Sequence, residues 1–393
     1  MRNNLFKMTA VAGALALTLT ACGSDDGGDT DGEGGGALAG EGSGDTCVIE
    51  AEIPIGAAVS LTGAAASYGE SQKNGLELAA EHLNEKDGVT YALTVEDDQT
   101  DPKQAISVFE TFAGDGTSLI IGPTLSNTAF QAQPIAQEES VPVLAISNTA
   151  AGITAQGDWI FRDSLTEGQV IPQTVAKAVE TYGLENVIVM YSNDDAFTES
   201  GYDVMASSLE EEGITVADTL TFSKADTDFR ALLTEAKAAN PDAIFVSGLI
   251  EAAIPLVTQA RELGLDMPII GGNGFNNPQL MADAGDAAEG VVVGAAWNSA
   301  SDNPENADFL SSYEEKFGSG PDQFAAQAYA AMTIIDHAVR EGCDGSREAI
   351  KAGLGNITDL PTVLGPISIN ADRDAEHDAV VQVVKDGKFT VLP

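Results

Sequence analysis

Short apolar runs alternate with amphipathic stretches along most of the chain. Runs such as 53–60 and 243–247 are rich in aliphatic residues and end at small or polar residues, which is typical of buried strands. Between such runs, apolar residues recur at helical spacing, for example over 102–112 and 323–340. Strands that alternate with helices predict a mainly parallel sheet covered on both faces, so the pattern indicates an α/β fold.

The alternation falls into two blocks of similar size with a repeated architecture but no repeated sequence. In the first block we expect strands over 53–60, 91–96, 118–121 and 141–146 and helices over 71–83, 102–112 and 127–138. In the second we expect strands over 186–191, 215–222, 243–247, 268–271 and 290–295, helices over 171–182, 200–212, 229–239 and 252–263, and then helices over 310–317 and 323–340. A length of 393 residues suits two such lobes.

The first segment of the chain is predicted to be an export signal. Arg2 and Lys7 give it a basic start, and an apolar run follows that is too short to span a bilayer comfortably. The run ends in the letters LTAC at Cys22, which resembles a bacterial lipobox. We therefore expect a lipoprotein signal peptide over 1–21 and lipidation of Cys22; the alternative is an ordinary secretory signal with an incidental cysteine.

An acidic, glycine-rich stretch follows the expected signal. Ten of the residues 23–44 are glycine, and no apolar periodicity is present. Such a composition has nothing to bury and predicts a flexible tether over 22–45. A lipid anchor and a tether together predict an extracytoplasmic protein held near the cell membrane.

The charge balance argues against nucleic acid as a partner. Lys and Arg total 18 against 61 Asp and Glu, a formal charge of −43. Phosphate binding needs clustered basic residues, so nucleic acid is not expected as a partner. Hydrophobic residues make up 44% of the chain, which is enough for folded cores despite the charge.

Enzyme signatures are missing from the sequence. It contains neither a Gly-x-Ser-x-Gly elbow nor a phosphate-binding P-loop motif. His82, His337 and His377 fall away from the expected strand ends, so a Ser-His-Asp arrangement lacks its base. With three Cys and three His, a zinc site of several Cys and His ligands is not expected, and we expect no cofactor.

Short polar loops follow the expected strands. In open parallel sheets, ligands bind beyond the carboxyl ends of the strands, near helix N-termini. These loops carry hydroxyls, small residues and a few aromatics but almost no charge; they are 60–69, 122–128, 147–150, 191–197, 247–249 and 271–275. They predict a site for a small polar molecule.

The loops and the helices beside them also carry a family resemblance. The segments SLTGAAASYGESQKNGLELAAEHLNE, DDQTDPKQAI and IIGPTLSNTAFQAQPIAQEESVPVLAISNTA resemble type I periplasmic substrate-binding proteins, most of all the leucine/isoleucine/valine-binding proteins of ABC importers. The resemblance runs from about Val48 to the end of the chain. It implies two Rossmann-like lobes joined by a three-crossover hinge, ligand capture without chemistry, and docking on an ABC permease in the membrane.

The resemblance also implies lobe boundaries. It places 46–164 plus 297–364 in the N-terminal lobe and 165–296 plus 365–393 in the C-terminal lobe. The crossovers are expected near 163–168, 294–298 and 365–369.

The family's ligand-binding residues match particular positions of this chain. The Ser that meets the ligand carboxylate matches Ser126, and the carbonyl and hydroxyl that meet the α-amino group match Ser147 and Thr149. The aromatics of the first loop and of the second lobe match Tyr68 and Phe197.

Two positions depart from the family pattern. An aromatic residue is replaced by Leu249, and the acid that pairs with the ligand ammonium is replaced by Asn273. A buried ammonium is costly without an anion, and Asn carries no charge. Either Asp194, Asp195 or Glu251 takes over, which keeps a branched-chain or other amino acid as the ligand, or the ligand is an amide, urea or a small carboxylate.

Each of these positions has a purely structural alternative. Ser126 can cap a helix beginning near Asn127. Trp297 can line the cleft or pack at the hinge, and Phe275 can belong to the core. Similarly, Thr149 can close a turn, Tyr68 can pack under a loop and Phe197 can belong to a small hydrophobic cluster beside the main core.

Two further expectations follow from the resemblance. Export permits oxidation, and in this fold the first strand and the helix ending near Arg340 share one lobe, so we expect a disulfide between Cys47 and Cys343. The same fold also occurs in ligand-sensing receptor modules. Neighbouring genes for permeases and ATPases would favour an importer over such a receptor. A hydrolase on the α/β frame is the second rival, and reversible binding without turnover would exclude it.

Overall fold

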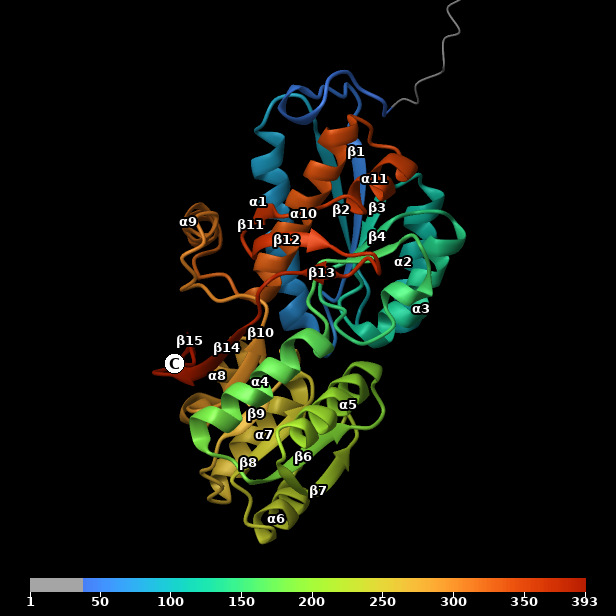
Figure 1. The fold of residues 1–393 in the computed structure, drawn as a ribbon. Coiled ribbons are helices and arrows are strands. Elements are labelled where there is room, and N and C mark those ends of the chain that lie inside the picture. The colour runs from blue at the N-terminus through green and yellow to red at the C-terminus, as the bar shows by residue number, and fades with distance from the viewer. Residues whose placement is uncertain (1–37) are drawn as a thin grey trace, which may run out of the picture. The chain divides into compact units, whose positions relative to one another are not determined.

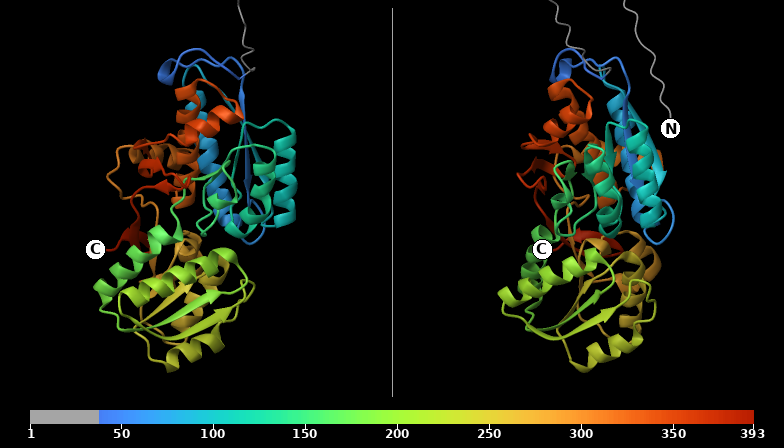
Figure 2. Two further views of the ribbon diagram at one scale, coloured as in Figure 1. Left: turned by 45° about the vertical axis from the view of Figure 1, so that its right-hand side comes forward. Right: turned by 90° about the vertical axis from the view of Figure 1, so that its right-hand side faces the viewer.

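The computed structural model describes residues 38–393, and the expected signal peptide, Cys22 and most of the tether lie outside this range. Two sheets organise the described residues, and helices cover both faces of each (Figures 1 and 2). The α/β class expected from the alternation is therefore confirmed.

The first sheet is wholly parallel, with strand order β2-β1-β3-β4-β5. Its strands are β1 (Ile53–Val59), β2 (Tyr91–Asp97), β3 (Leu119–Ile121), β4 (Val143–Ala145) and β5 (Ile160–Arg162). One face packs on α1 (Ala66–Asn84), α9 (Asn306–Phe317), α10 (Gln323–Gly342) and α11 (Arg347–Leu354), the other on α2 (Pro102–Gly114) and α3 (Ser126–Glu138). Because side chains alternate along a strand, Ile55 and Ala57 of β1 enter one core and Ala58 enters the other.

The second sheet has the order β15-β14-β10-β9-β8-β6-β7, with β14 and β15 antiparallel to the rest at one edge. Its strands are β6 (Asn186–Ser192), β7 (Thr215–Phe222), β8 (Ala243–Ser247), β9 (Ile269–Gly271), β10 (Val292–Ala295), β14 (Val380–Lys385) and β15 (Lys388–Val391). Its helices are α4 (Glu167–Tyr182) and α5 (Ala196–Glu211) on one face, and α6 (Arg230–Ala238), α7 (Ile250–Glu262) and α8 (Gln279–Ala284) on the other. We call the halves built on these sheets the first and the second lobe.

Local sequence explains where several helices begin. Asp101 caps α2, since its carboxylate accepts hydrogen bonds from the backbone of Lys103 and Gln104, and Pro102 occupies the first helical position. Thr166 and Gln169 form a capping box at the start of α4. That start falls directly after the chain leaves β5, so the cap also fixes the first crossover between the lobes.

The third crossover lies later than the sequence predicts. A small antiparallel sheet of β11 (Leu360–Thr362), β12 (Gly365–Ile369) and β13 (Ala375–Glu376) packs on the first lobe, and Ile367, Ile369 and Ala375 are buried in that lobe's core. The chain therefore crosses between β13 and β14, and the expectation of a crossover near 365–369 is wrong. The assignment of 365–376 to the C-terminal lobe is wrong for the same reason.

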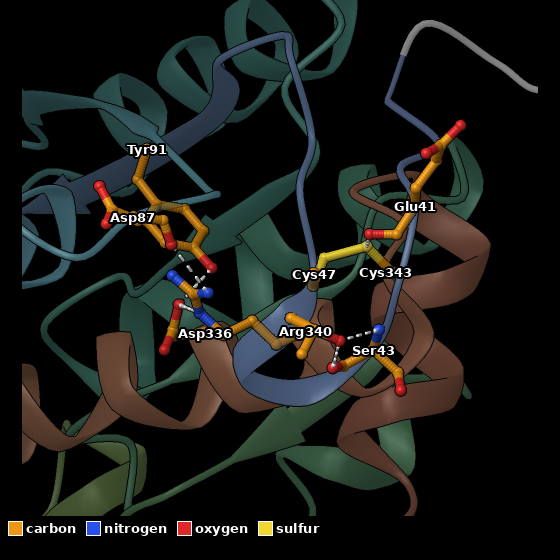
Figure 3. The surroundings of a disulfide bond; sticks show 9 residues. Glu41, Ser43, Cys47, Asp87, Tyr91, Asp336, Arg340 and Cys343 are labelled. Carbon is orange, nitrogen blue, oxygen red and sulfur yellow. Dashed lines mark hydrogen bonds and ion pairs between the residues drawn. A yellow bond between two sulfur atoms is a disulfide. The ribbon is translucent and has the colours of Figure 1, made fainter.

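The start of the described chain is attached to the end of α10. Cys47 and Cys343 form the expected disulfide, with their Cα atoms 5.3 Å apart (Figure 3). The backbone N–H of Gly40 also donates to the carbonyl of Cys343. Nearby, Tyr91 and Arg340 both donate to the carboxylate of Asp336, at 2.8 and 2.7 Å. These contacts bind β2, α10 and the N-terminal segment into one unit.

No helix within residues 38–393 is long and apolar enough to cross a membrane.

Candidate ligand-binding site

Two neighbouring cavities lie where the carboxyl ends of the parallel strands of the two sheets face each other. The inner cavity has a volume of about 20 Å³ and is lined by Tyr68, Thr124, Leu125, Ser126, Ser147, Asp195, Phe197, Leu249, Asn273, Gly274 and Phe324. The outer cavity has a volume of about 450 Å³ and shares Leu125, Asp195 and Leu249 with it. Six of the seven residues expected at the site line the inner cavity, and only Thr149 lines neither.

Tyr68 links the two lobes through its hydroxyl. Its side chain comes from α1 of the first lobe and is 2% exposed. The hydroxyl donates to the carbonyl of Gly274 at 2.6 Å and accepts from the backbone N–H of Ile250 at 2.7 Å, both in the second lobe. Ile250 opens α7, so Tyr68 satisfies one of the N–H groups that a helix start leaves unpaired. The Tyr68 hydroxyl therefore bridges the two lobes, and the side chain does more than pack under a loop.

Ser126 lies at the first position of α3 and does not cap it. The capping position is Leu125, and no side chain caps this helix. The hydroxyl of Ser126 accepts one long hydrogen bond, 3.4 Å from the backbone N–H of Ala150. The serine therefore presents an available hydroxyl at a helix N-terminus, an arrangement that favours an anionic group.

The loop 147–150 is held rigidly by side chains around it. The Ser147 hydroxyl donates to the Thr124 carbonyl at 2.6 Å and accepts from Gln72 at 2.7 Å, which leaves the Ser147 carbonyl as its group for a ligand. Thr149 is buried, and its hydroxyl has no hydrogen-bond partner in the described part of the chain. Thr149 lines neither cavity.

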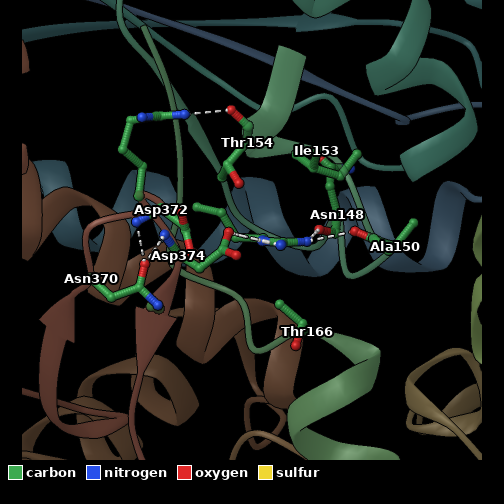
Figure 4. A network of polar contacts seen from close by, with 12 residues as sticks. Asn148, Ala150, Ile153, Thr154, Thr166, Asn370, Asp372 and Asp374 are labelled. Atoms are coloured by element: carbon green, nitrogen blue, oxygen red, sulfur yellow. Dashed lines mark hydrogen bonds and ion pairs between the residues drawn. The ribbon is translucent and has the colours of Figure 1, made fainter. Parts of the chain in front are cut away.

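Arg162 fixes the other side of this loop. Its buried guanidinium donates to the carbonyls of Asn148 and Ala150, both at 2.8 Å, and pairs with Asp374 at 2.7 Å (Figure 4). Arg162 ends β5 and Asp374 precedes β13, so one side chain ties the site loop to two of the segments that connect the lobes. The loop cannot shift without losing two hydrogen bonds from a buried guanidinium.

Asn273 is held by an amide network at the hinge. The Gln323 side-chain oxygen accepts from the backbone N–H of Ala296 at 2.6 Å, so its amino group must point the other way and donate to the side-chain oxygen of Asn273. The same Gln323 oxygen accepts from Asn276, which in turn accepts from Gln382. The hydrogen bond from Gln323 orients the Asn273 amide, whose NH2 group can donate to an oxygen atom of a ligand and whose oxygen keeps one lone pair.

The three acids considered as replacements lie in different surroundings. Asp194 accepts from Ser192, Ser223 and the backbone of Lys224, so it braces a surface loop and lines neither cavity. Asp195 lines both cavities, and Glu251 lines the outer one. Geometry therefore leaves Asp195 and Glu251 as the acids that a ligand can reach.

A fourth carboxylate lies close by, and the sequence did not single it out. Glu167, at the start of α4, is 3% exposed, and its backbone N–H donates to the carbonyl of Thr149 at 3.0 Å. Burial raises the pKa of its carboxyl to about 7.

Five further residues at the site were not singled out from the sequence, although the first three lie in loops expected there: Thr124, Leu125, Gly274, Gln323 and Phe324. Phe324 packs on Tyr68, with ring centroids 4.7 Å apart. The sequence feature that could have indicated Gln323 and Phe324 is their position at the start of a long apolar helix, next to a hinge.

Trp297 and Phe275, for which the sequence left two interpretations, both belong to hydrophobic cores. The Trp297 indole N–H donates to Asn306, and the ring packs edge-on against Phe309 in the first lobe's core. Trp297 therefore packs at the hinge. Phe275 is fully buried in the core of the second lobe.

The fold and the site together define a two-lobed binding protein with its ligand site in a cleft at a hinge. Residues 52–388 match the family of periplasmic binding proteins, and the chain belongs to that family.

Known relatives agree with this assignment over most of their length. The chain is 28% identical to the leucine-, isoleucine-, valine-, threonine- and alanine-binding protein of Pseudomonas aeruginosa, over 79% of this chain and 84% of that protein. It is 26% identical to a Leu/Ile/Val-binding protein of Rhizobium johnstonii, over 83% and 90%.

Solved structures show the same fold. The branched-chain amino acid transporter substrate-binding protein of Streptococcus pneumoniae, solved with isoleucine, superposes with a TM-score of 0.82 at 26% identity, over 86% of this chain and 98% of that one. A leucine-binding protein from Thermotoga maritima gives a TM-score of 0.82 at 25% identity, over 87% and 98%. A solute-binding protein of R. palustris, solved with benzoate, shares the fold with a TM-score of 0.80 at 24% identity, over 87% and 96%.

Proposed function

We propose that this protein captures a small polar solute, an amino acid or a close relative, outside the cytoplasm and delivers it to an ABC permease. The observation that carries the proposal is the Tyr68 link: one first-lobe side chain reaches two backbone groups of the second lobe, beside a cavity lined by both. A ligand in such a cleft adds contacts that exist only when the lobes are closed. Binding therefore drives closure by population shift.

The proposed binding mode assigns a role to each lobe. The ligand's carboxylate or other oxygen meets Ser126 and the start of α3 in the first lobe. Asn273 of the second lobe donates to another oxygen, and Phe197 and Leu249 cover the apolar part of the solute. Each of these contacts is non-covalent, so the proposed function involves no chemical step.

The lipid anchor is also part of the proposal. The lipobox-like end of the first segment at Cys22 supports attachment to the membrane, which would keep the binding protein close to its permease. Mass spectrometry of the N-terminal peptide of the exported protein tests this: a diacylglycerol-modified Cys22 is expected, and a free Cys22 thiol would contradict it.

A thermal-shift screen tests the binding function. The purified chain is heated with leucine, isoleucine, valine, small carboxylates, amides and urea. A ligand at a hundred times its dissociation constant stabilises the fold by about 2.7 kcal/mol, which gives a clear rise in melting temperature. We expect such a rise with at least one amino acid. If none of these solutes raises the melting temperature, the proposed ligand class is wrong.

A further inference from the structure

Five buried side-chain amides form a chain of hydrogen bonds that runs from the hinge to the inner cavity. Each amide donates from its NH2 group to the side-chain oxygen of the next, in the order Asn298, Gln382, Asn276, Gln323 and Asn273. The first three of these hydrogen bonds are each 2.6 Å long. Because all five residues are buried, each amide depends on its neighbours in the chain and not on bulk water.

Two backbone N–H groups fix the direction of this amide chain. At its far end, the N–H of Ala300 donates to the side-chain oxygen of Asn298 at 2.8 Å, which turns the Asn298 amino group toward the next amide. Near the cavity, the N–H of Ala296 donates to the side-chain oxygen of Gln323 at 2.6 Å, which turns the Gln323 amino group toward Asn273. An amide has its donors on one atom and its acceptor on the other, so both N–H groups require the same direction along the whole chain. The oxygen of Asn273 therefore faces Gln323, and its NH2 group makes no hydrogen bond to another residue within 38–393.

Gln323 is the member of the amide chain that belongs to the first lobe. It opens α10, whereas Asn273, Asn276 and Gln382 lie in the second lobe and Asn298 lies just after β10, in the second crossover. Gln323 does not line the inner cavity, but Asn273 does. Gln323 can therefore act on a ligand only through Asn273, and the orientation of Asn273 depends on how α10 is seated against the hinge.

We propose that Gln323 is a positioning residue that sets the specificity of the site: by donating to the oxygen of Asn273, it directs the NH2 group of Asn273 to the ligand. This role rests on the proposed binding function and specifies it, because the site then favours a solute with a hydrogen-bond acceptor at this point over one with only donors there. A donor opposite the same NH2 group leaves both groups unpaired, which is costly in a buried place. The Asn273 oxygen keeps one lone pair, so a donor is disfavoured and not excluded.

Three solutes with one carbon skeleton measure this preference by titration calorimetry with the wild-type chain. At the carbon next to the carboxylate, 4-methyl-2-oxopentanoate has a carbonyl that only accepts, leucine has an ammonium that only donates, and 4-methylpentanoate has neither. All three share the carboxylate that the proposed binding mode places at Ser126. We expect the oxo acid to bind about fivefold more tightly than 4-methylpentanoate, since it gains one hydrogen bond from an oriented donor.

Two substitutions of Gln323 then change the orientation of Asn273. Gln323→Glu keeps the shape of the side chain but replaces the amino group that faces Asn273 by an oxygen. The Asn273 amide then turns, donates to that oxygen and presents its own oxygen to the ligand. The affinity for leucine relative to the oxo acid should rise at least about tenfold. Gln323→Met removes the hydrogen bond without adding a charge, so the oxo acid should lose its advantage over 4-methylpentanoate.

Gln327→Glu is the matched control for the added charge. Gln327 lies one turn further along α10, is 1% exposed, and its side chain makes no hydrogen bond in the described part of the chain. The same substitution there leaves the amide chain intact, so the affinity for leucine relative to the oxo acid should stay within about threefold of the wild type.

The remaining outcomes contradict the proposed role of Gln323. Relative affinities that neither Gln323 variant changes refute the positioning role while the binding function stands. An equal shift in Gln323→Glu and Gln327→Glu assigns the effect to charge alone and refutes it as well. If none of the three solutes binds to the wild type, the proposed ligand class is wrong, and so is the specificity assigned to Asn273.

Discussion

The hydroxyl of Tyr68 offers a direct way to separate closure of the cleft from folding. Replacing it by Phe keeps the ring that packs on Phe324 but removes both hydrogen bonds to the second lobe. In the closed protein, the carbonyl of Gly274 and the N–H of Ile250 then lose their partner in a buried place. In the open protein both groups reach water, so the cost applies to closure alone.

The size of the effect follows from the two groups left without a partner. Each buried, unsatisfied backbone group costs about 1–2 kcal/mol, so Tyr68→Phe disfavours closure by about 2–4 kcal/mol. This corresponds to a fall in the closing equilibrium constant of about 30- to 1,000-fold. The dissociation constant of any solute that needs closure rises by a similar factor.

Tyr91→Phe is the matched control. Tyr91 is also buried, and its hydroxyl donates to Asp336 at 2.8 Å, but both residues lie within the first lobe. The control should lower the free energy of unfolding without changing closure.

Calorimetry and small-angle X-ray scattering of both variants, with a solute that stabilises the wild type, distinguish the two effects. The Tyr68 variant should bind weakly and stay expanded, whereas the Tyr91 variant should bind and contract like the wild type. If both variants bind equally well, the Tyr68 hydroxyl does not hold the cleft closed.

Three further predictions concern the stability of the fold. Replacing both Cys47 and Cys343 by Ser should lower the free energy of unfolding by up to about 6 kcal/mol, because the disulfide closes a loop with a sequence separation of 296. Thiol titration of the denatured wild type should find neither of these cysteines free. Burial raises the folded-state pKa of Glu167 to about 7 from an ordinary 4.5, so the wild type loses stability as the pH rises between these values. Glu167→Gln should remove up to about 3 kcal/mol of that loss. If urea titrations give the same difference in stability between the two proteins at pH 5 and at pH 8, this prediction is wrong. Arg162→Met leaves the half-buried Asp374 carboxylate without its partner and removes the two hydrogen bonds to the loop 147–150, so it should cost up to about 3 kcal/mol. An unchanged urea midpoint would show that Arg162 does not stabilise the fold.

Much of the fold was predictable because its elements are long or continuously apolar. β8 matches its predicted range 243–247, where five consecutive residues are buried, and α2 and α10 lie within a few residues of expectation. The sequence does not reveal β5, α8 or the strands after residue 354, which are two to six residues long and carry no clear periodicity. The misplaced third crossover has the same origin, because only pairing with β11 shows which lobe holds β12 and β13.

That the candidate residues would gather in one place was predictable, but the hydrogen bonds that their groups make were not. Parallel strands bring their carboxyl ends together, so loops far apart in sequence were expected to meet, and residues 68, 126, 147, 197, 249 and 273 line one cavity. Whether an individual hydroxyl or amide is available depends on distant partners. The side-chain oxygen of Asn273 accepts a hydrogen bond from Gln323, 50 residues away in the sequence. The hydroxyl of Ser147 accepts one from Gln72, 75 residues away.

The disulfide at the base of the first lobe has a mechanical consequence. A pull on the chain upstream of residue 38 first meets the contacts of Leu38 and Gly40 with the segment after α10. Beyond them, the force reaches Cys47, where it divides between the backbone toward β1 and the covalent link to Cys343 at the end of α10. Unravelling the first strand from its end would thus require α10 to yield at the same time, so the load is carried by the whole first lobe and the cleft remains free to open and close.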